Sequence, residues 1–308
     1  MVAWQIHAIL IFGLFSIGAV VGSFLNVCIY RIPWEKSVIW PASHCPRCFS
    51  SIAAQDNVPI ISWMSLRGEC RTCGLPISAR YPLIEALVGV LFASVYVITI
   101  LYGKPIPWGT LPASIPVGLV YHLIFVALLV TATFIDYDLT IIPDLITIPG
   151  MIIGIAVGAI CPEIRTPPSS WQGINHWDGL WVGLIGLLAG GGITQGFRLV
   201  GSLVLRREAM GFGDVTLMAM IGAFLGWQAA VLTFFIGPFF GLGHALMKIL
   251  VFIGKKLRGV KSSAADREIP FGPYLSMAAL AMLFSWPWFW PGWAKQNFDL
   301  LRMVFSPL

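Results

Sequence analysis

Residues 211–228 read GFGDVTLMAMIGAFLGWQ, an apolar run that begins with an aspartate, Asp214, just after two glycines, Gly211 and Gly213. A carboxylate is costly at membrane depth, where such groups usually face a cavity, a partner or a pathway. The glycines lack Cβ atoms, so another backbone can approach this stretch closely. Both features suit a substrate-binding edge. The alternative is a helix start that Asp214 caps after a glycine-rich turn.

More apolar runs surround this one along the chain. The 308 residues are 57% hydrophobic and 11% charged, whereas an average soluble domain has about 25% charged residues. A membrane span takes about 20 predominantly apolar residues, so the sequence predicts an all-α polytopic membrane protein with about eight transmembrane helices. The candidate runs are residues 6–30, 82–102, 111–136, 139–161, 179–204, 214–228, 229–253 and 271–290.

The 19 Lys and Arg residues predict the orientation, because basic residues concentrate in cytoplasmic loops. Most of them follow the first, fifth and seventh runs, so these loops are expected in the cytoplasm and both termini outside. No Lys or Arg precedes the first run, which is therefore expected to be a retained span and not a signal peptide. The net charge of +5 requires no nucleic-acid partner, because the lipid bilayer has an anionic inner face. The basic residues of these loops are Arg31, Lys36, Arg47, Arg67, Arg71, Arg80, Arg206, Arg207, Lys255, Lys256, Arg258, Lys261 and Arg267.

One polar segment, residues 31–81, carries a metal-binding pattern. It contains two C-x2-C pairs, Cys45 with Cys48 and Cys70 with Cys73. Two such turns complete a tetrahedral four-sulfur zinc site, and a full cysteine set leaves no open position, which indicates structural zinc. Disulfides are the alternative, but the expected cytoplasmic side is reducing. The expected domains are therefore a first transmembrane helix (1–30), a small cytoplasmic zinc domain (31–81) and a seven-span core (82–308).

A second group of carboxylates ends the third apolar run. Asp136, Asp138 and Asp144 follow one another there, and no Lys or Arg lies between Lys104 and Arg165 to neutralise them. One of the three can be a helix cap and one can be solvated, which leaves a candidate for chemistry. Their loop is expected on the same membrane face as the loop that carries Asp214.

Two carboxylates held close together share one proton, because two like charges at short range cannot both ionise. Such a pair can activate a water as base and protonate a leaving amine as acid, which is peptide hydrolysis without a metal. No Ser-His-Asp set or HExxH motif competes with it in this chain. The glycines would let an extended peptide substrate form backbone hydrogen bonds. Two other classes are a transporter with an aspartate relay and a zinc-bearing membrane scaffold without chemistry.

In these residues the chain resembles a known family, the type IV prepilin peptidases. Members of this family are bifunctional leader peptidases and N-methyltransferases, and they belong to the GxGD membrane aspartyl proteases. The resemblance covers roughly residues 16–290 and consists of many separate motifs that occur in the same order. These motifs are GSFLNVCIYRIP (22–33), SHCPRC (43–48), DNVPIISW (56–63), LRGECRTC (66–73), PISARYPLIE (76–85), DYDLTIIPD (136–144), MGFGD (210–214) and IPFGPYL (269–275).

The resemblance implies a reaction: a short basic leader is cleaved from prepilin-like proteins after a glycine, and the new N-terminus is methylated with S-adenosylmethionine. It places the catalytic aspartates at Asp136 and Asp214, with Gly211, Gly213 and Asp144 supporting them. It also implies that the four cysteines bind zinc, and that the partners are prepilins or pseudopilins of a type IV pilus or type II secretion system. The expected location is the bacterial inner membrane, with the site and zinc domain facing the cytoplasm.

Two departures from the family pattern stand out, namely Thr216 in place of a frequent lysine and a long outer loop at 162–178. Neither removes a catalytic group. A peptidase without methyltransferase activity stays open as an alternative, because no glycine-rich nucleotide fingerprint marks the S-adenosylmethionine site. The basic loop 254–268 has no assigned role.

Overall fold

The apolar runs form helices, as backbone polar groups inside a bilayer require. The structure, a computed structural model, describes residues 2–45, 47–102, 115–164, 175–206, 208, 210–257 and 270–289. The expected loops at 162–178 and 254–268 lie partly outside these residues, and the tail from Pro291 lies wholly outside them. The long helices are α1 (Val2–Arg31), α3 (Arg80–Tyr96), α4 (Ile115–Leu139), α5 (Asp144–Ile160), α6 (His176–Leu205), α7 (Phe212–Leu225), α8 (Trp227–Leu257) and α9 (Gly272–Phe289).

Each of the eight expected runs coincides with one of these helices, and no strand occurs among the described residues. Five helices are long and apolar enough to cross a membrane, namely α1, α3, α4, α6 and α8. Helices α5 and α7 are shorter apolar helices. The all-helical membrane fold is thus confirmed, and the number of about eight spans stays a prediction. The loop expected from Gly254 begins later than predicted, because α8 continues to Leu257.

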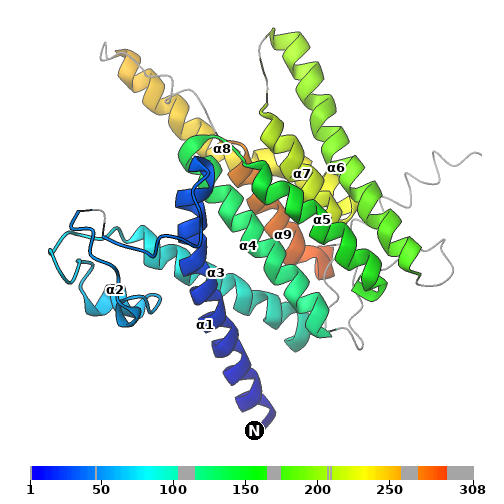
Figure 1. Ribbon diagram of the computed structural model, residues 1–308. Helices are drawn as coiled ribbons and strands as arrows, with labels where there is room; N and C mark the ends of the chain where they lie inside the picture. Colours follow the sequence, from blue (N-terminus) through cyan, green and yellow to red (C-terminus); the bar gives the residue numbers. More distant parts are fainter. Residues whose placement is uncertain are drawn as a thin grey trace, which may run out of the picture.

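Helix α7 packs between α5 and α6 (Figure 1) and ends just before Gly226, whose φ is 81°. Its 14 residues span only about 21 Å, and all of them from Asp214 to Leu225 are buried. Its contact with α6 depends on glycines. A Cβ at Gly186 would lie 2.1 Å from the carbonyl oxygen of Gly222. A Cβ at Gly190 would lie 2.2 Å from the carbonyl oxygen of Met218, so the two helix backbones are in close contact.

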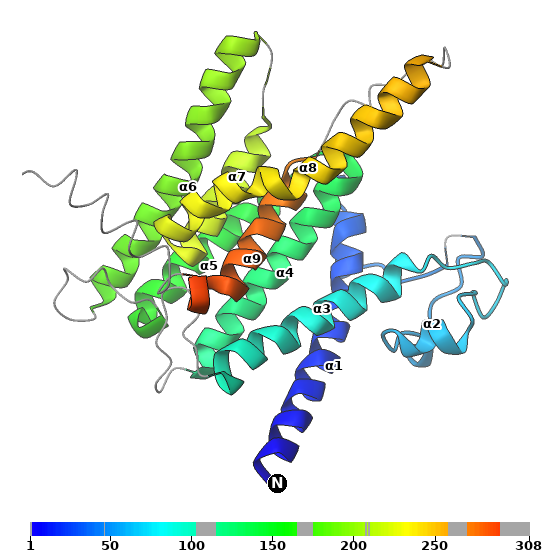
Figure 2. The same cartoon turned by 180° about the vertical axis from the view of Figure 1, so that it is seen from behind.

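Helices α1 and α3 cross beside this bundle and carry the cysteine segment, residues 31–81, as a lateral lobe with the short helix α2 (Ile61–Ser65) (Figures 1 and 2). The crossing is also close: a Cβ at Gly18 would lie 2.8 Å from Cα of Gly89. Farther along, the side-chain amide of Asn26 donates to the carbonyl oxygen of Tyr81 at 3.3 Å. Small and polar residues of α1 therefore pack on α3.

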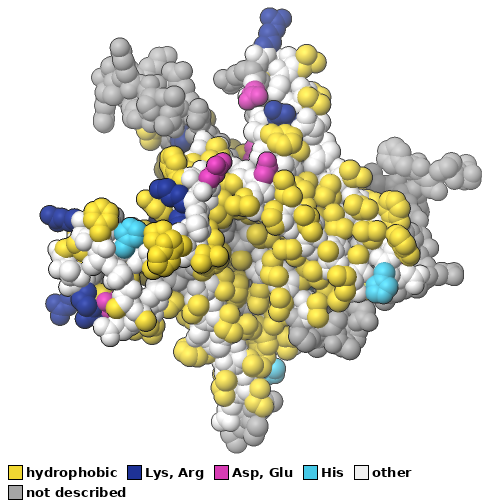
Figure 3. All heavy atoms as spheres, viewed as in Figure 1, with side chains coloured by type: hydrophobic (Ala, Val, Ile, Leu, Met, Phe, Trp, Pro, Cys, Tyr) yellow, Lys and Arg dark blue, Asp and Glu magenta, His cyan; other side chains and the backbone are white. Residues whose placement is uncertain are grey.

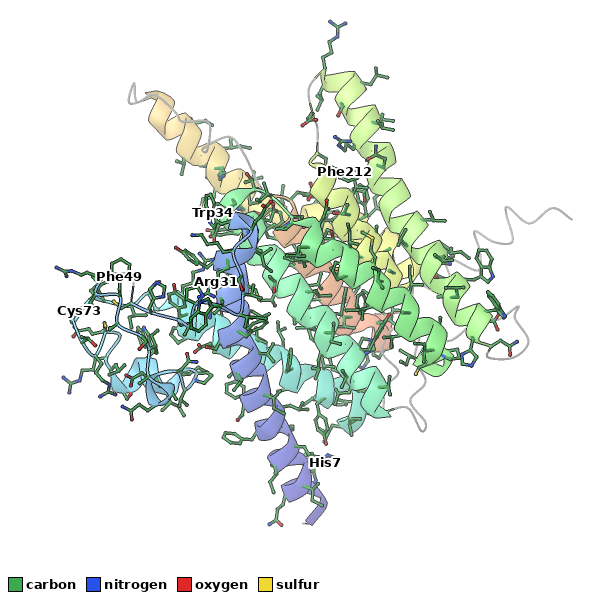
Figure 4. All side chains as sticks on the ribbon, viewed as in Figure 1. His7, Arg31, Trp34, Phe49, Cys73 and Phe212 are labelled. Carbon is green, nitrogen blue, oxygen red and sulfur yellow. The ribbon has the colours of Figure 1, made fainter. Side chains whose placement is uncertain are left out.

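Hydrophobic side chains cover the visible face of the bundle, whereas Lys, Arg, Asp and Glu gather on the lobe and at one end (Figure 3). Leu188 and Phe239 are 68% and 74% exposed on α6 and α8. Such a contiguous apolar surface is what a helix bundle presents to lipid. Phe212 lies at the same end as Arg31 and Trp34, and His7 lies at the opposite end (Figure 4).

Candidate active site and metal centre

Asp136 lies in the last turn of α4 and is buried, with 5% of its surface exposed. Its Oδ2 accepts a hydrogen bond of 2.9 Å from the backbone N–H of Gly272, the first residue of α9. A Cβ at position 272 would lie 2.7 Å from the same oxygen, so only glycine lets this backbone approach so closely. A helix start thus holds one carboxylate from a distant part of the chain.

Asp214 lies in the first turn of α7 and is 8% exposed. The helix begins at Phe212 with Gly211 as its N-cap residue. Asp214 is therefore the third residue of the helix, and it takes part in the helix start from there and not as the N-cap residue itself. The N–H of Gly211 donates toward the Asp214 carboxylate, and Asp136 acts on this carboxylate electrostatically. The structure therefore brings the two buried aspartates together, where the helix dipole also favours negative charge.

Ile142, in the connection between α4 and α5, fixes the two helix starts relative to each other. A Cβ at Gly213 would lie 2.9 Å from Cβ of Ile142, and one at Gly272 would lie 2.9 Å from its Cδ1. Both glycines therefore pack directly on this side chain. The stretches 136–144, 211–214 and 270–275 converge on a single small region.

The two other carboxylates of the 136–144 stretch lie elsewhere. Asp138 is paired with Arg80, whose Nη1 and Nη2 donate to its two oxygens at 2.8 and 2.6 Å. The missing cation thus comes from α3, in a different part of the sequence. Asp144 is the first residue of α5 and is exposed, with no hydrogen bond or ion pair to the part of the chain that the structure describes. The structure therefore does not bring Asp144 into the buried pair.

Two residues at the site escaped the sequence reasoning. Gly272 was quoted only as part of a motif, and the glycine between two prolines was the available signal. Arg198 of α6, the second of these residues, holds the start of α7. Its Nε donates to the carbonyl oxygen of Met210 at 3.1 Å, and its guanidinium lies 5.8 Å from the ring centroid of Phe212.

The four cysteines of the lobe meet as their spacing predicts. Their sulfur atoms all lie within 4.8 Å of one another. The Sγ atoms of Cys45 and Cys73 are 3.7 Å apart, and those of Cys48 and Cys70 are 4.0 Å apart. Two sulfurs bound tetrahedrally at 2.3 Å from zinc would be about 3.8 Å apart. The cluster can therefore hold a metal ion, and its cysteines are free rather than disulfide-bonded.

The protonation of these thiols also fits a cation site. The Ser50 hydroxyl and backbone lower the pKa of Cys48 to about 6. The N–H of Leu75 lowers the pKa of Cys73, but burial and the three neighbouring thiols outweigh it and raise this pKa to about 11. Four crowded thiols cannot all ionise unless a cation compensates them. A metal ion would supply this compensation.

Comparisons with known proteins show the family of the chain. Residues 16–99 match the bacterial peptidase A24 N-terminal domain, and residues 123–246 match the type IV leader peptidase family. A protein of Myxococcus xanthus named prepilin leader peptidase/N-methyltransferase is 41% identical over 219 residues, which are 70% of this chain and 56% of that protein.

Two relatives with the same name match over more of their length. The one from Aeromonas hydrophila is 32% identical over 314 residues, covering 88% of this chain and 89% of its own. The one from Pseudomonas putida is 30% identical over 284 residues, which cover 85% of this chain and 86% of that protein. No solved structure matches the chain. With both halves matched and these relatives covered almost end to end, the chain belongs to the type IV leader peptidase family.

Proposed function

We propose that this protein is a membrane-embedded aspartyl endopeptidase in which Asp136 and Asp214 form the catalytic pair. One observation carries the proposal: Asp136 of α4 and Asp214 of α7 are both buried where Gly213 and Gly272 pack on Ile142, and the N–H of Gly272 holds Asp136. A buried pair of carboxylates costs folding free energy, so its presence indicates a function. A relay across the bilayer would need carboxylates distributed in depth, whereas Asp136, Asp138, Asp144 and Asp214 all lie in terminal turns of helices.

The chemistry follows from one shared proton. The ionised carboxylate removes a proton from a water, whose oxygen forms a bond to the scissile carbonyl carbon. The protonated carboxyl donates its proton to the carbonyl oxygen, which gives a tetrahedral diol. As the C–N bond breaks, the proton taken from water passes to the leaving amine, and the deprotonated carboxylate takes its proton back from one hydroxyl of the diol. Gly211 is exposed beside Asp214, so the backbone of an extended substrate can approach this edge.

The substrate is the leader of a prepilin or pseudopilin of a type IV pilus or type II secretion system, cleaved after a glycine. The names of the relatives support this class of substrate. Basic residues dominate the loops expected in the cytoplasm, which supports a cytoplasmic site in the bacterial inner membrane with both termini outside.

Methylation of the new N-terminus with S-adenosylmethionine is the second proposed activity. Residues 1–30 then form the first transmembrane helix, 31–81 the zinc domain associated with methyl transfer, and 82–308 the protease core. The ion pair of Arg80 with Asp138 supports a contact between the zinc domain and the protease core. It ties the end of the cysteine segment to a position two residues from Asp136, so the two activities would lie close together.

One assay tests both activities. Purified protein in lipid nanodiscs is incubated with a prepilin-like peptide and labelled S-adenosylmethionine, and cleavage and label transfer are read in the same sample. We expect the label on the new N-terminal residue of the cleaved product. Cleavage without label would leave a peptidase only, and label without cleavage would contradict the aspartyl peptidase.

Metal content tests the cysteine cluster. We propose zinc as its ion, and elemental analysis should give about one zinc per chain. Cys48→Ser should lose the ion, because three sulfurs no longer complete the tetrahedral set. Cys161→Ser is the matched control, since Cys161 lies outside the cluster. A Cys48→Ser protein with full metal content would refute the site.

A further inference from the structure

Glu85, a buried carboxylate outside the proposed pair, lies in α3 next to the cysteine segment. It is 8% exposed, and its Oε2 accepts a hydrogen bond of 2.7 Å from the backbone N–H of Ile60. Helix α1 packs directly on its backbone, because a Cβ at Gly22 would lie 2.8 Å from Cα of Glu85. The carboxylate is therefore held in a fixed place, where it reaches the segment between the two cysteine pairs.

Its partner, Ile60, has an unusual backbone. The residue has φ 63° and ψ −53°, and the N–H of Ile61 donates to the carbonyl oxygen of Pro59 at 2.6 Å. This is the rare γ-turn with positive φ, which is strained, and a β-branched residue is an outlier there. Such strain persists only where the surroundings impose it. The hydrogen bond to a carboxylate, stronger than one to a neutral acceptor, supplies that constraint.

The turn at Ile60 is connected to the second cysteine pair. Ile60 immediately precedes α2, where Trp63 donates from its Nε1 to the carbonyl oxygen of Ile77 at 2.9 Å. The ring of Trp63 covers Gly68, where an added Cβ would lie 2.9 Å from its Cζ2. Gly68 stands two residues before Cys70. A shift of the turn at Ile60 would therefore move Trp63 and Gly68, and with them the loop that carries Cys70.

We propose that Glu85 is a positioning residue for methyl transfer, docking the cysteine segment on α1 and α3 by imposing the strained turn at Ile60. The inference rests on the proposed methyltransferase activity. The proposed role concerns methyl transfer and not cleavage, because α9 and Ile142, and not Glu85, hold the aspartate pair. Loss of Glu85 should then affect methyl transfer and leave cleavage intact.

The test measures both activities of Glu85→Ala in nanodiscs with the same peptide and labelled S-adenosylmethionine. We expect methyl transfer to fall about tenfold or more, since a charge-assisted hydrogen bond is lost, and cleavage to stay near the wild-type rate. Glu85→Gln keeps an acceptor for Ile60 and should restore most of the transfer. Glu35→Gln, an exposed carboxylate of the same segment, is the matched control and should match the wild type.

A second variant tests the strain itself. Glycine adopts positive φ freely, so Ile60→Gly should reduce the effect of Glu85→Ala when the two are combined. Equal losses with and without Ile60→Gly would overturn the strain argument. If the Glu85→Gln protein is as inactive as the Glu85→Ala protein, the positioning role is overturned, because the amide oxygen of glutamine can still accept the N–H of Ile60.

Hydrogen exchange separates failure of this inference from failure of the proposed activity. The Ile60 amide should be protected in the wild type and exchange at least about tenfold faster in Glu85→Ala. Fast exchange in the wild type would refute the docking, whether or not the protein transfers methyl groups. A wild type that transfers no label but shows the predicted protection would refute the methyltransferase proposal and keep the docking.

Discussion

Asparagine at position 136 or 214, introduced separately, is expected to lower the rate of prepilin cleavage by at least about 10³-fold. The pair needs one carboxylate to take a proton from water and one carboxyl to donate a proton, and an amide does neither at neutral pH. Each single substitution therefore removes a required role, and the double substitution should be no worse than either alone. The measurement is kcat for a prepilin-like peptide in nanodiscs, with residual product followed over hours.

The fold should survive these substitutions. Asparagine has nearly the shape of aspartate, and at position 136 its Oδ1 can still accept the N–H of Gly272. Both variants should accumulate in the membrane with wild-type thermal stability. Asp138→Asn is the matched control, because its partly exposed ion pair with Arg80 is worth at most about 1 kcal/mol, or about fivefold in rate. Full cleavage by Asp136→Asn or Asp214→Asn would exclude the catalytic pair.

The helices and the cysteine cluster were predictable because a short sequence pattern indicates each of them. A run of apolar residues forms a helix wherever it lies in a bilayer, and two C-x2-C turns present their thiolates without help from distant residues. The pairing of Asp136 with Asp214 needed more. Loop charges placed both on one membrane face, and the family resemblance chose among the three carboxylates of the 136–144 stretch.

What the sequence could not supply are contacts between distant segments. Arg80 neutralises Asp138 across 58 positions, and Gly272 holds Asp136 across 136 positions. No periodicity or motif spacing encodes such a contact. The complete burial of α7 from Asp214 to Leu225 has the same origin, since helices from other parts of the chain cover it. The catalytic roles of the aspartates and the supporting role of Asp144 stay predictions.

Gly272→Ala is expected to have the second largest effect, and it acts on the geometry of the site and not on its chemical groups. The new Cβ would lie 2.7 Å from Oδ2 of Asp136 and 2.9 Å from Cδ1 of Ile142. Neither contact is tolerable without movement. The carboxylate, at the end of a short side chain, gives way more easily than the backbone of α9. It should therefore rotate out of its hydrogen bond with the N–H of residue 272.

A displaced carboxylate no longer faces Asp214 correctly, and a misplacement of about 1 Å lowers catalysis about 100-fold. Cleavage by Gly272→Ala should therefore fall by about this factor in kcat, while the melting temperature changes little. Gly243→Ala is the matched control, because a Cβ there meets nothing within 4 Å on α8, and alanine favours helices over glycine. Equal cleavage by the two variants would mean that the N–H of Gly272 does not position Asp136 for catalysis. A Gly272→Ala protein that fails to fold would instead show that the packing of α9 depends on the close approach of Gly272 to Asp136 and Ile142. The same loss of stability in Gly272→Ser would establish this dependence.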